Sequence, residues 1–475
     1  MRIGIMQTVR ALWEIEPHER LKTLFLGSAF FAIIASYTII KELKDSIFMN
    51  IVGNVKFVPH AKLFMMFGVI PLVLIYSKLV DKVRRYQLLS YFSWIYAVLG
   101  LFCAFIIKLG GLGNEIVQPY SLYWFFGWFF YFYIESFSPF VVGVYWAFLN
   151  SIYSPESAKQ NYGILISVSK LGGMFSSGIA WFLLSYNTHC RWGLGCTDTN
   201  MHVFLMIGSS LILMIVPFVI TMMMKVVPGR YLHGYEAAYQ FEKKQSKSGK
   251  EETGILAGIW MFAKYPYVFG IFCTIFFYEM LSAVLSYMRL GVAQSASGDI
   301  SGVSCFLFKV VFFTHLIGFI ISLFGTRAIV TYLGERLSLL VMPVAMGTLL
   351  FYLMISKSPS ALIAAFVALR SIYYAFNQPV TELLYIPTVK DMKFKSKSWI
   401  DTFGKKLARA GGSGFNIVAS SLTTSVAGSI HGIFFGSIVI LWSFVSLMLG
   451  KRYYKAIAQG EVIGAELAPK VAKEG

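Results

Sequence analysis

Long apolar runs dominate this chain and leave few folds open to it. Hydrophobic residues occupy 57% of its 475 positions and charged residues only 13%, a balance that excludes an ordinary soluble domain of this size. A membrane-crossing helix needs about 20 mostly apolar residues in succession. The sequence predicts twelve such spans, at approximately 23–40, 61–80, 87–107, 121–148, 162–185, 202–224, 265–288, 303–325, 337–355, 360–386, 407–427 and 430–450. An all-α integral membrane protein is therefore expected.

The distribution of basic residues predicts the orientation of these spans. An even number of spans places both termini on one side of the membrane. About three quarters of the 41 Lys and Arg residues fall in segments on that side, as in short cytoplasmic loops. We therefore expect both termini to be cytoplasmic. The net charge of +18 is then mainly a topology signal, and no nucleic-acid binding is expected.

A polar interruption divides the predicted spans into two groups of six. Residues 225–256 include a run of lysines, serines and glutamates typical of a solvated linker. The predicted organisation is an N-terminal bundle at 1–224, a cytoplasmic linker at 225–256, and a C-terminal bundle with a short tail at 257–475. Lys170-Leu171-Gly172-Gly173 in the fifth span matches Arg409-Ala410-Gly411-Gly412 in the eleventh. This match favours a parallel repeat of two six-helix bundles.

The loop at 77–85 reads Ser-Lys-Leu-Val-Asp-Lys-Val-Arg-Arg. It resembles a degenerate form of the cytoplasmic gating motif of the major facilitator superfamily, without the glycines of that motif. An ordinary positively charged loop is the alternative. With the two bundles, the resemblance implies a major-facilitator-like fold.

Charged residues directly follow the apolar run of the first span. A charge near the centre of a membrane helix costs about 2.5–3.5 kcal/mol on insertion scales, so such residues usually face water or a partner. On a helix, Tyr37, Lys41, Lys44 and Asp45 share one face, whereas Glu42 points away. This face is a candidate binding wall.

Three further acids lie at or near membrane depth: Glu135 in the fourth span, Glu279 in the seventh and Glu382 near the end of the tenth. Each requires a partner or water. Trp124, Trp128 and Tyr131 share a helical face with Glu135. They could stack a purine beside the carboxylate, or they could serve packing and lipid contact, which the frequency of Trp and Tyr at interfaces favours.

The tenth span combines polar residues with a proline. Arg370 and Asn377 lie at helical spacing, and Pro379 is expected to break the helix just before Glu382. A broken helix with polar residues suggests a substrate site, because freed backbone groups need protein, water or ligand. A structural kink within a satisfied polar network is the alternative.

Basic residues also cluster before the eleventh span. Most of the run from Lys390 to Arg409 is interpreted as a solvated cytoplasmic face, but Lys397 and Arg409 are candidates for contacting a phosphate. Lys170 lies inside the fifth span. Catalytic and metal-binding motifs are absent from the sequence, so neither an enzyme nor a cofactor is expected. Cys190 and Cys196 share a predicted outer loop, where a disulfide is permitted if the compartment oxidises.

Four segments, in order along nearly the whole chain, resemble the nucleotide transporter family of ATP/ADP antiporters from intracellular bacteria and plastids. They are Tyr37–Ser46, Glu135 with Tyr145–Asn150 and Ala158–Gly163, Pro379–Pro387, and Lys395–Asp401 with Gly411-Gly412. The resemblance implies that Lys44, Glu135, Glu279 and Lys397 recognise or exchange a nucleotide. The sequence departs from the family pattern at four positions, where family cations or other polar groups are replaced: Lys41, Gln160, Thr381 and Leu285.

The resemblance implies a monomeric carrier in a bacterial cytoplasmic membrane that exchanges ATP for ADP, or related nucleotides, by alternating access. Phosphates would be held by Lys44 and Lys397, with Lys41, Lys170 or Arg409 as further candidates. The base would lie near Glu135 or the tenth span. A proton-coupled importer of nucleotides or nucleotide cofactors, titrating Glu135 or Glu279, is the first alternative. A membrane-embedded enzyme or lipid-handling protein is the second.

Overall fold

The structure is a computed structural model that describes residues 17–464 apart from 81–82, 114–116, 154, 190–196, 230–263, 323–325, 386, 389–395 and 397–398. The described chain is almost entirely helical, and its β pairing consists of an isolated bridge between Thr388 and Ile463. Within this part of the chain, ten helices are long and apolar enough to cross a bilayer. The predicted all-α membrane architecture is confirmed.

The ten helices coincide with ten of the twelve predicted spans. The second and eleventh predicted spans fall on α3 (Phe57–Val80) and α17 (Lys405–Ser420). At 16 residues, α17 is shorter than the roughly 20 residues that a full crossing requires. The number twelve therefore stays a prediction. Most of the predicted linker lies outside the described residues, as do Cys190 and Cys196.

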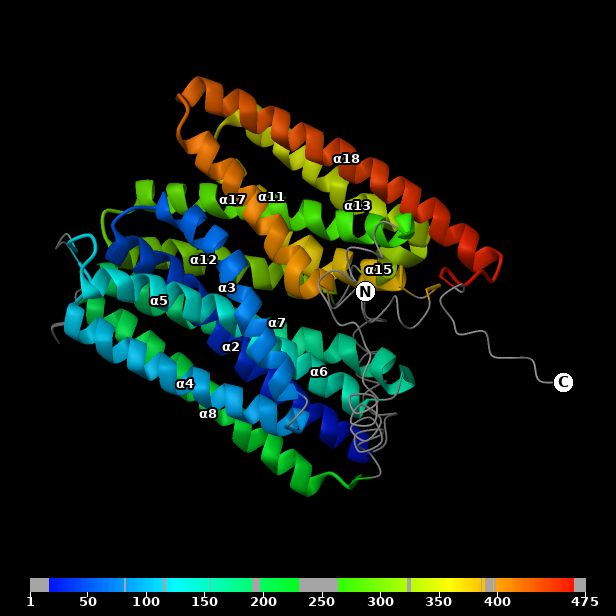
Figure 1. The fold of residues 1–475 in the computed structure, drawn as a ribbon, viewed down its shortest axis with the longest axis horizontal. Helices are drawn as coiled ribbons and strands as arrows, with labels where there is room; N and C mark the ends of the chain where they lie inside the picture. Colours follow the sequence, from blue (N-terminus) through cyan, green and yellow to red (C-terminus); the bar gives the residue numbers. More distant parts are fainter. Residues whose placement is uncertain are drawn as a thin grey trace. The chain divides into compact units, whose positions relative to one another are not determined.

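The first of two compact units comprises Met1–Lys250 and Leu290–Leu323. Its further elements are α2 (Pro17–Val52), α4 (Arg85–Gly110), α5 (Leu122–Phe137), the π-helical turn η1 (Ser138–Val142), α6 (Gly143–Ile152), α7 (Pro155–His189), α8 (Asp198–Val226) and α12 (Ile300–Ile320). Helix α2 packs against α5, α7, α8 and α12, and α4 runs beside α8 (Figure 1). The central helix of this unit is thus the one that carries the charged segment.

The second unit comprises Glu251–Arg289 and Phe324–Gly475. Its further elements are most of α11 (Pro266–Ala296), then α13 (Thr326–Ser356), α14 (Pro359–Ile372), the π-helical segment η4 (Tyr373–Asn377), α15 (Gln378–Leu383), η6 (Ile400–Gly404) and α18 (Thr424–Ala458). Helix α13 lies along α18 and also packs against α14 (Figure 1).

Side-chain caps explain where several of these helices begin. Ser121, Thr197, Asp299 and Ser358 each precede a helix and accept a hydrogen bond from the backbone N–H three residues later. Such caps satisfy donors that the first helical turn leaves unpaired. They define the starts of α5, α8, α12 and α14.

The first predicted span ends too early. Helix α2 continues to Val52, so the charged segment lies in its interior rather than at its end. Glu42, expected to point away from the binding wall, is also buried, at 3% exposure. Hydropathy falls where the charges begin, but partners on other helices allow the charges to stay buried.

The expected break at Pro379 is also wrong. The chain stays helical from Pro359 to Leu383, and its irregularity is the π-helical segment η4 just before the proline. A proline ring collides with the carbonyl four residues earlier, which here belongs to Ala375 within η4. The backbone widens into the π-helical segment at that turn and continues as α15.

The two matching Gly-Gly pairs occupy similar packing positions. A Cβ atom on Gly172 of α7 would lie 2.5 Å from the carbonyl oxygen of Phe31 on α2. A Cβ atom on Gly412 of α17 would lie 2.7 Å from the carbonyl oxygen of Met280 on α11. Both sites exclude a side chain, because the neighbouring backbone occupies its space. In each case the fifth predicted span of a half touches the first, as a parallel repeat requires.

Candidate functional site

Lys44 lies between two carboxylates in the interior of the first unit. Its Nζ atom is 2.5 Å from Oε1 of Glu135 on α5 and 3.3 Å from Oδ1 of the adjacent Asp45. The Lys44 side chain is 4% exposed, against 17% for Glu135 and 13% for Asp45. A buried ammonium needs such partners, since an unpaired charge at this depth is strongly unfavourable. The structure thus brings three of the predicted site residues together.

Aromatic rings enclose the same ammonium group. Lys44 Nζ lies 4.3 Å from the ring centre of the buried Tyr131, a cation–π distance. Phe48 of α2 contacts Tyr131 at 4.8 Å and Trp128 at 5.3 Å between ring centres. Trp128 in turn contacts Trp124 at 5.6 Å. In this structure the aromatic residues of the predicted wall therefore pack against one another and against Phe48 of the same unit.

Two other predicted cations belong to the same unit. Lys41 lies one turn before Lys44 on α2, with its Nζ atom 5.4 Å from the ring centre of Tyr37. Tyr37 stacks on Phe137 at the end of α5. Lys170 lies on α7, two residues before the glycine that touches α2. Both lysines are partly buried.

In the second unit the more deeply buried member of an ion pair is the carboxylate, whereas at Lys44 it is the cation. Nε of Arg409 on α17 lies 2.7 Å from Oε2 of Glu279 on α11. Here the carboxylate is buried, at 4% exposure, and the guanidinium is partly exposed, at 36%. Lys405 and Arg370 also act electrostatically on the Glu279 carboxylate. Glu279 therefore lies among several cations, and its described ion-pair partner is Arg409.

Two arginines of this unit meet at one phenylalanine. The Cζ atoms of Arg289 and Arg370 lie 4.4 Å and 5.0 Å from the ring centre of Phe366 on α14. The two guanidinium carbons are therefore no farther apart than the sum of those distances, 9.4 Å. A phosphate accepts bidentate hydrogen bonds from guanidinium groups. Arg370 was a sequence candidate, whereas Arg289 was not.

The sequence signal for Arg289 lies just past the predicted seventh span. Arg289 follows that span by one residue and was counted as a loop residue, although α11 continues to Ala296. Its side chain is only 2% exposed. The apolar residues that follow it, including Leu290 and Ala293, were the available sign that the helix continued.

The remaining candidates are only partly described. Asn377 ends η4, is 2% exposed, and accepts a hydrogen bond from Thr381 through its carbonyl oxygen at 2.8 Å. Glu382 lies in α15, but its side chain is outside the described part of the structure. Lys397 lies outside the described residues. Their membership of the site stays a prediction.

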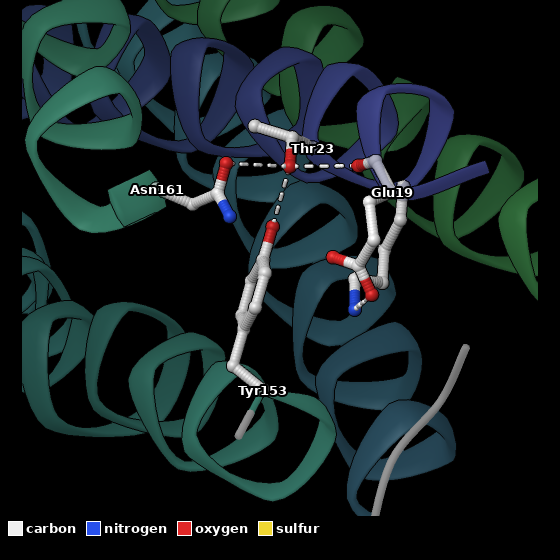
Figure 2. Close-up of polar contacts among 5 residues, drawn as sticks. Glu19, Thr23, Tyr153 and Asn161 are labelled. Atoms are coloured by element: carbon white, nitrogen blue, oxygen red, sulfur yellow. Dashed lines mark hydrogen bonds and ion pairs between the residues drawn. The ribbon is translucent and has the colours of Figure 1, made fainter. Parts of the chain in front are cut away.

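A polar cluster near the start of α2 was not predicted (Figure 2). Thr23 Oγ1 lies 2.9 Å from the carbonyl oxygen of Glu19, 2.8 Å from the hydroxyl of Tyr153 and 3.2 Å from Oδ1 of Asn161. Buried Lys22 pairs with the Glu19 carboxylate at 2.7 Å. Burial raises the pKa of Tyr153, which lies between two spans, so its hydroxyl remains a donor. The cluster connects α2 to Tyr153 in the turn after α6 and to Asn161 on α7.

The fold is similar to that of solved membrane transporters. Over 91% of the chain it is similar to the inward-open xylose transporter XylE from E. coli, with a TM-score of 0.59 and 12% identity over 95% of that protein. A D-xylose-proton symporter gives a TM-score of 0.58 over 91% of the chain and 96% of its own. At such identities the similarity establishes a major-facilitator-like fold.

The family follows from the sequence matches. The family model for the TLC ATP/ADP transporter matches residues 3–453, and the chain belongs to this family. ADP,ATP carrier protein 1 of Chlamydia muridarum is 22% identical over 98% of this chain and 94% of its own length. The protein of the same name from Rickettsia typhi is 21% identical over 95% of this chain and 97% of its own. The resemblance drawn from the sequence motifs is confirmed.

Proposed function

We propose that the protein exchanges ATP for ADP, or closely related nucleotides, across the membrane by alternating access. The observation that carries this proposal is the pair of ionic clusters inside the two units, one around Lys44 and one around Glu279. Buried charges in spanning helices usually mark a substrate pathway. Family membership and the names of the relatives supply the nucleotide as the substrate class.

In this proposal the two clusters bind phosphates in different ways. At Lys44, a phosphate group would replace Glu135 as the partner of the ammonium, so binding and release exchange one anion for another. Around Glu279, Arg409, Arg370 and Arg289 would surround a phosphate with guanidinium groups. Moderate affinity follows at Lys44, because Glu135 and Asp45 already compensate the ammonium without substrate.

The environment of the carrier completes the proposal. It would act as a monomer in a bacterial cytoplasmic membrane, with both termini in the cytoplasm. The excess of Lys and Arg in the loops on the side of the termini supports that orientation.

Exchange can be tested with purified protein in proteoliposomes loaded with ADP at the same pH inside and outside. We expect labelled ATP to enter loaded vesicles and not empty ones. Entry into empty vesicles that depends on an imposed pH gradient would replace exchange by proton-coupled uptake, for which Glu135 and Glu279 are the candidate proton acceptors. Failure of every nucleotide to move in either direction would contradict the proposed function.

A further inference from the structure

A buried histidine of the first unit joins three helices near the candidate site. His202 lies one turn into α8 and has no exposed surface. Its Nδ1 atom is 2.7 Å from the carbonyl oxygen of Asp198, and its Nε2 atom is 2.8 Å from Oγ of Ser304 on α12. Both ring nitrogens are therefore engaged in hydrogen bonds at a site that water does not reach.

The hydrogen bonds continue from Ser304 to the helix that carries Lys44. Ser304 Oγ lies 2.7 Å from Oγ of Ser46 on α2, and Ser46 Oγ lies 3.1 Å from the carbonyl oxygen of Leu43. Ser304 has no exposed surface and Ser46 is 2% exposed. We call this series of hydrogen bonds, from Asp198 through His202, Ser304 and Ser46 to Leu43, the His202 chain. It ends on the peptide bond between Leu43 and Lys44, next to the Lys44 ion pairs.

Counting protons along the His202 chain fixes its direction. The carbonyl of Leu43 only accepts, so Ser46 donates to it and must accept from Ser304. Ser304 donates its one hydroxyl proton to Ser46, so it must accept a hydrogen bond from Nε2 of His202. The carbonyl of Asp198 also only accepts, so Nδ1 of His202 carries a proton too. The complete set of bonds therefore requires the doubly protonated, cationic imidazole.

The neutral imidazole loses one bond of the set in either tautomer. With the proton on Nε2, the bond to the carbonyl of Asp198 is lost, and with the proton on Nδ1 the hydrogen bonds run in the opposite direction. Nε2 then accepts from Ser304, Ser304 accepts from Ser46, and the bond from Ser46 to Leu43 is lost. The bond between His202 and Ser304 is then no longer charge-assisted, and charge-assisted bonds are stronger than neutral ones. Protonation consequently strengthens the connection of α12 to α8 and α2, and deprotonation weakens it.

Charged groups lie at both ends of the His202 chain. Asp198, on the same helix, accepts a hydrogen bond from Ser301 of α12 at 2.7 Å, and Asp299 caps the N-terminus of α12. Burial disfavours the cationic form of His202, while the hydrogen bond to the Asp198 backbone and the charges of both carboxylates favour it. On α2, the charged neighbours of Ser46 are Asp45 and Lys44. The acids at the α8 end supply negative charge beside a cationic imidazole.

We propose that His202 is a proton-binding site that controls the rate of transport. The proton closes the His202 chain and holds α12 against α2 and α8. Helix α12 lies in the first unit of the structure but follows the predicted linker in sequence. By sequence it therefore belongs to the half that would move against the first half during alternating access. Exchange should therefore be slower when His202 is protonated. The kinetic part of this inference rests on the proposed function, whereas proton binding does not.

The proton site itself can be tested without transport. Spectra of protein labelled with ¹⁵N-histidine, recorded between pH 5 and 8, should contain a His202 signal that changes from two protonated nitrogens to one. That signal should vanish in His202→Gln. The control is His60→Gln, because His60 makes the same Nδ1 contact to a carbonyl four residues earlier, at 2.9 Å. A His202 ring that remains neutral and unchanged across this range would overturn the inference.

The control of rate can be tested with equal pH on both sides of ADP-loaded vesicles. We expect ATP exchange to rise about threefold to tenfold as His202 loses its proton, the range expected for one buried hydrogen bond. Ser304→Ala keeps the histidine and should remove this rise, while His60→Gln should keep it. A rise that persists in Ser304→Ala would overturn the role of the chain in rate control. An absence of ATP exchange in the unmodified protein would instead contradict the proposed function, leaving the NMR result to stand.

Discussion

The two ionic clusters are built with opposite charges at their buried centres. In the first unit a buried lysine, Lys44, is surrounded by the carboxylates of Glu135 and Asp45. In the second unit a buried carboxylate, Glu279, lies among cations and pairs with Arg409, which is partly exposed. The first cluster therefore carries an excess of negative charge around its cation, and the second an excess of positive charge around its anion.

In the proposed function, this inversion gives the two units different tasks. A nucleotide phosphate must compete with Glu135 for Lys44, because the lysine is already neutralised. It meets no such competition at the exposed side of Arg409. The second unit is thus suited to attract phosphates, and the first to exchange one anionic partner for another. Both units use a similar Gly-Gly packing contact, so the difference lies in the charges rather than in the backbone arrangement.

Replacing the buried cation should have the largest effect. Lys44→Gln leaves Glu135 and Asp45 side by side without the ammonium, and removes the proposed phosphate partner. We expect ADP-loaded vesicles to lose about 100-fold or more of their ATP exchange, since breaking a buried pair costs about 3–5 kcal/mol. Lys357→Gln, at an exposed position of the second unit, is the matched control. Normal exchange by Lys44→Gln would remove Lys44 from the site.

Replacing the buried anion should have a smaller effect. Glu279→Gln keeps the shape of the side chain but no longer orients Arg409. We expect exchange to fall about tenfold, the value of roughly one charge-assisted hydrogen bond. ATP affinity should change little, because Arg409 is already accessible. Glu461→Gln, which removes an exposed carboxylate paired with Arg452, is the control. A gain in ATP affinity of about tenfold or more in Glu279→Gln would contradict the contrast between the clusters.

The smallest effect is expected for the arginine that the sequence prediction missed. Arg289→Lys keeps the charge beside Phe366 but removes the planar guanidinium fork. We expect the KM for ATP to rise about fivefold, with less change for AMP, because the lost contacts are to phosphates. Arg452→Lys on α18 should leave both values unchanged. An equal rise for AMP and ATP would indicate a structural role for Arg289 instead.

The spans and the individual charged residues could be predicted from the sequence, because hydropathy and helical spacing are local properties. The predicted first span nevertheless ended at residue 40, where the charges begin, although α2 continues to Val52. Lys44 and Glu135 were both predicted as site residues, but their direct contact depends on the packing of α2 against α5. Spacing along a single helix carries no information about that packing.

Two further features depended on contacts between distant segments. Arg289 was assigned to a loop, because its charge ended the predicted apolar span at residue 288, although α11 continues to Ala296. The role of His202 could not be predicted, because its partner Ser304, and Ser46 beyond it, lie far from it in sequence. By contrast, the matching Gly-Gly pairs were visible in the sequence, since a repeat preserves small residues where two helices touch.

The competition between Glu135 and a phosphate for Lys44 is tested most directly by the affinity of Glu135→Gln for ATP. Binding of labelled ATP to the purified protein should become about tenfold tighter, equivalent to about 1.4 kcal/mol, because the amide no longer neutralises the lysine. Glu461→Gln should bind as the unmodified protein does. Weaker binding by Glu135→Gln would contradict the account, since it would mean that the Glu135 carboxylate itself contacts the nucleotide.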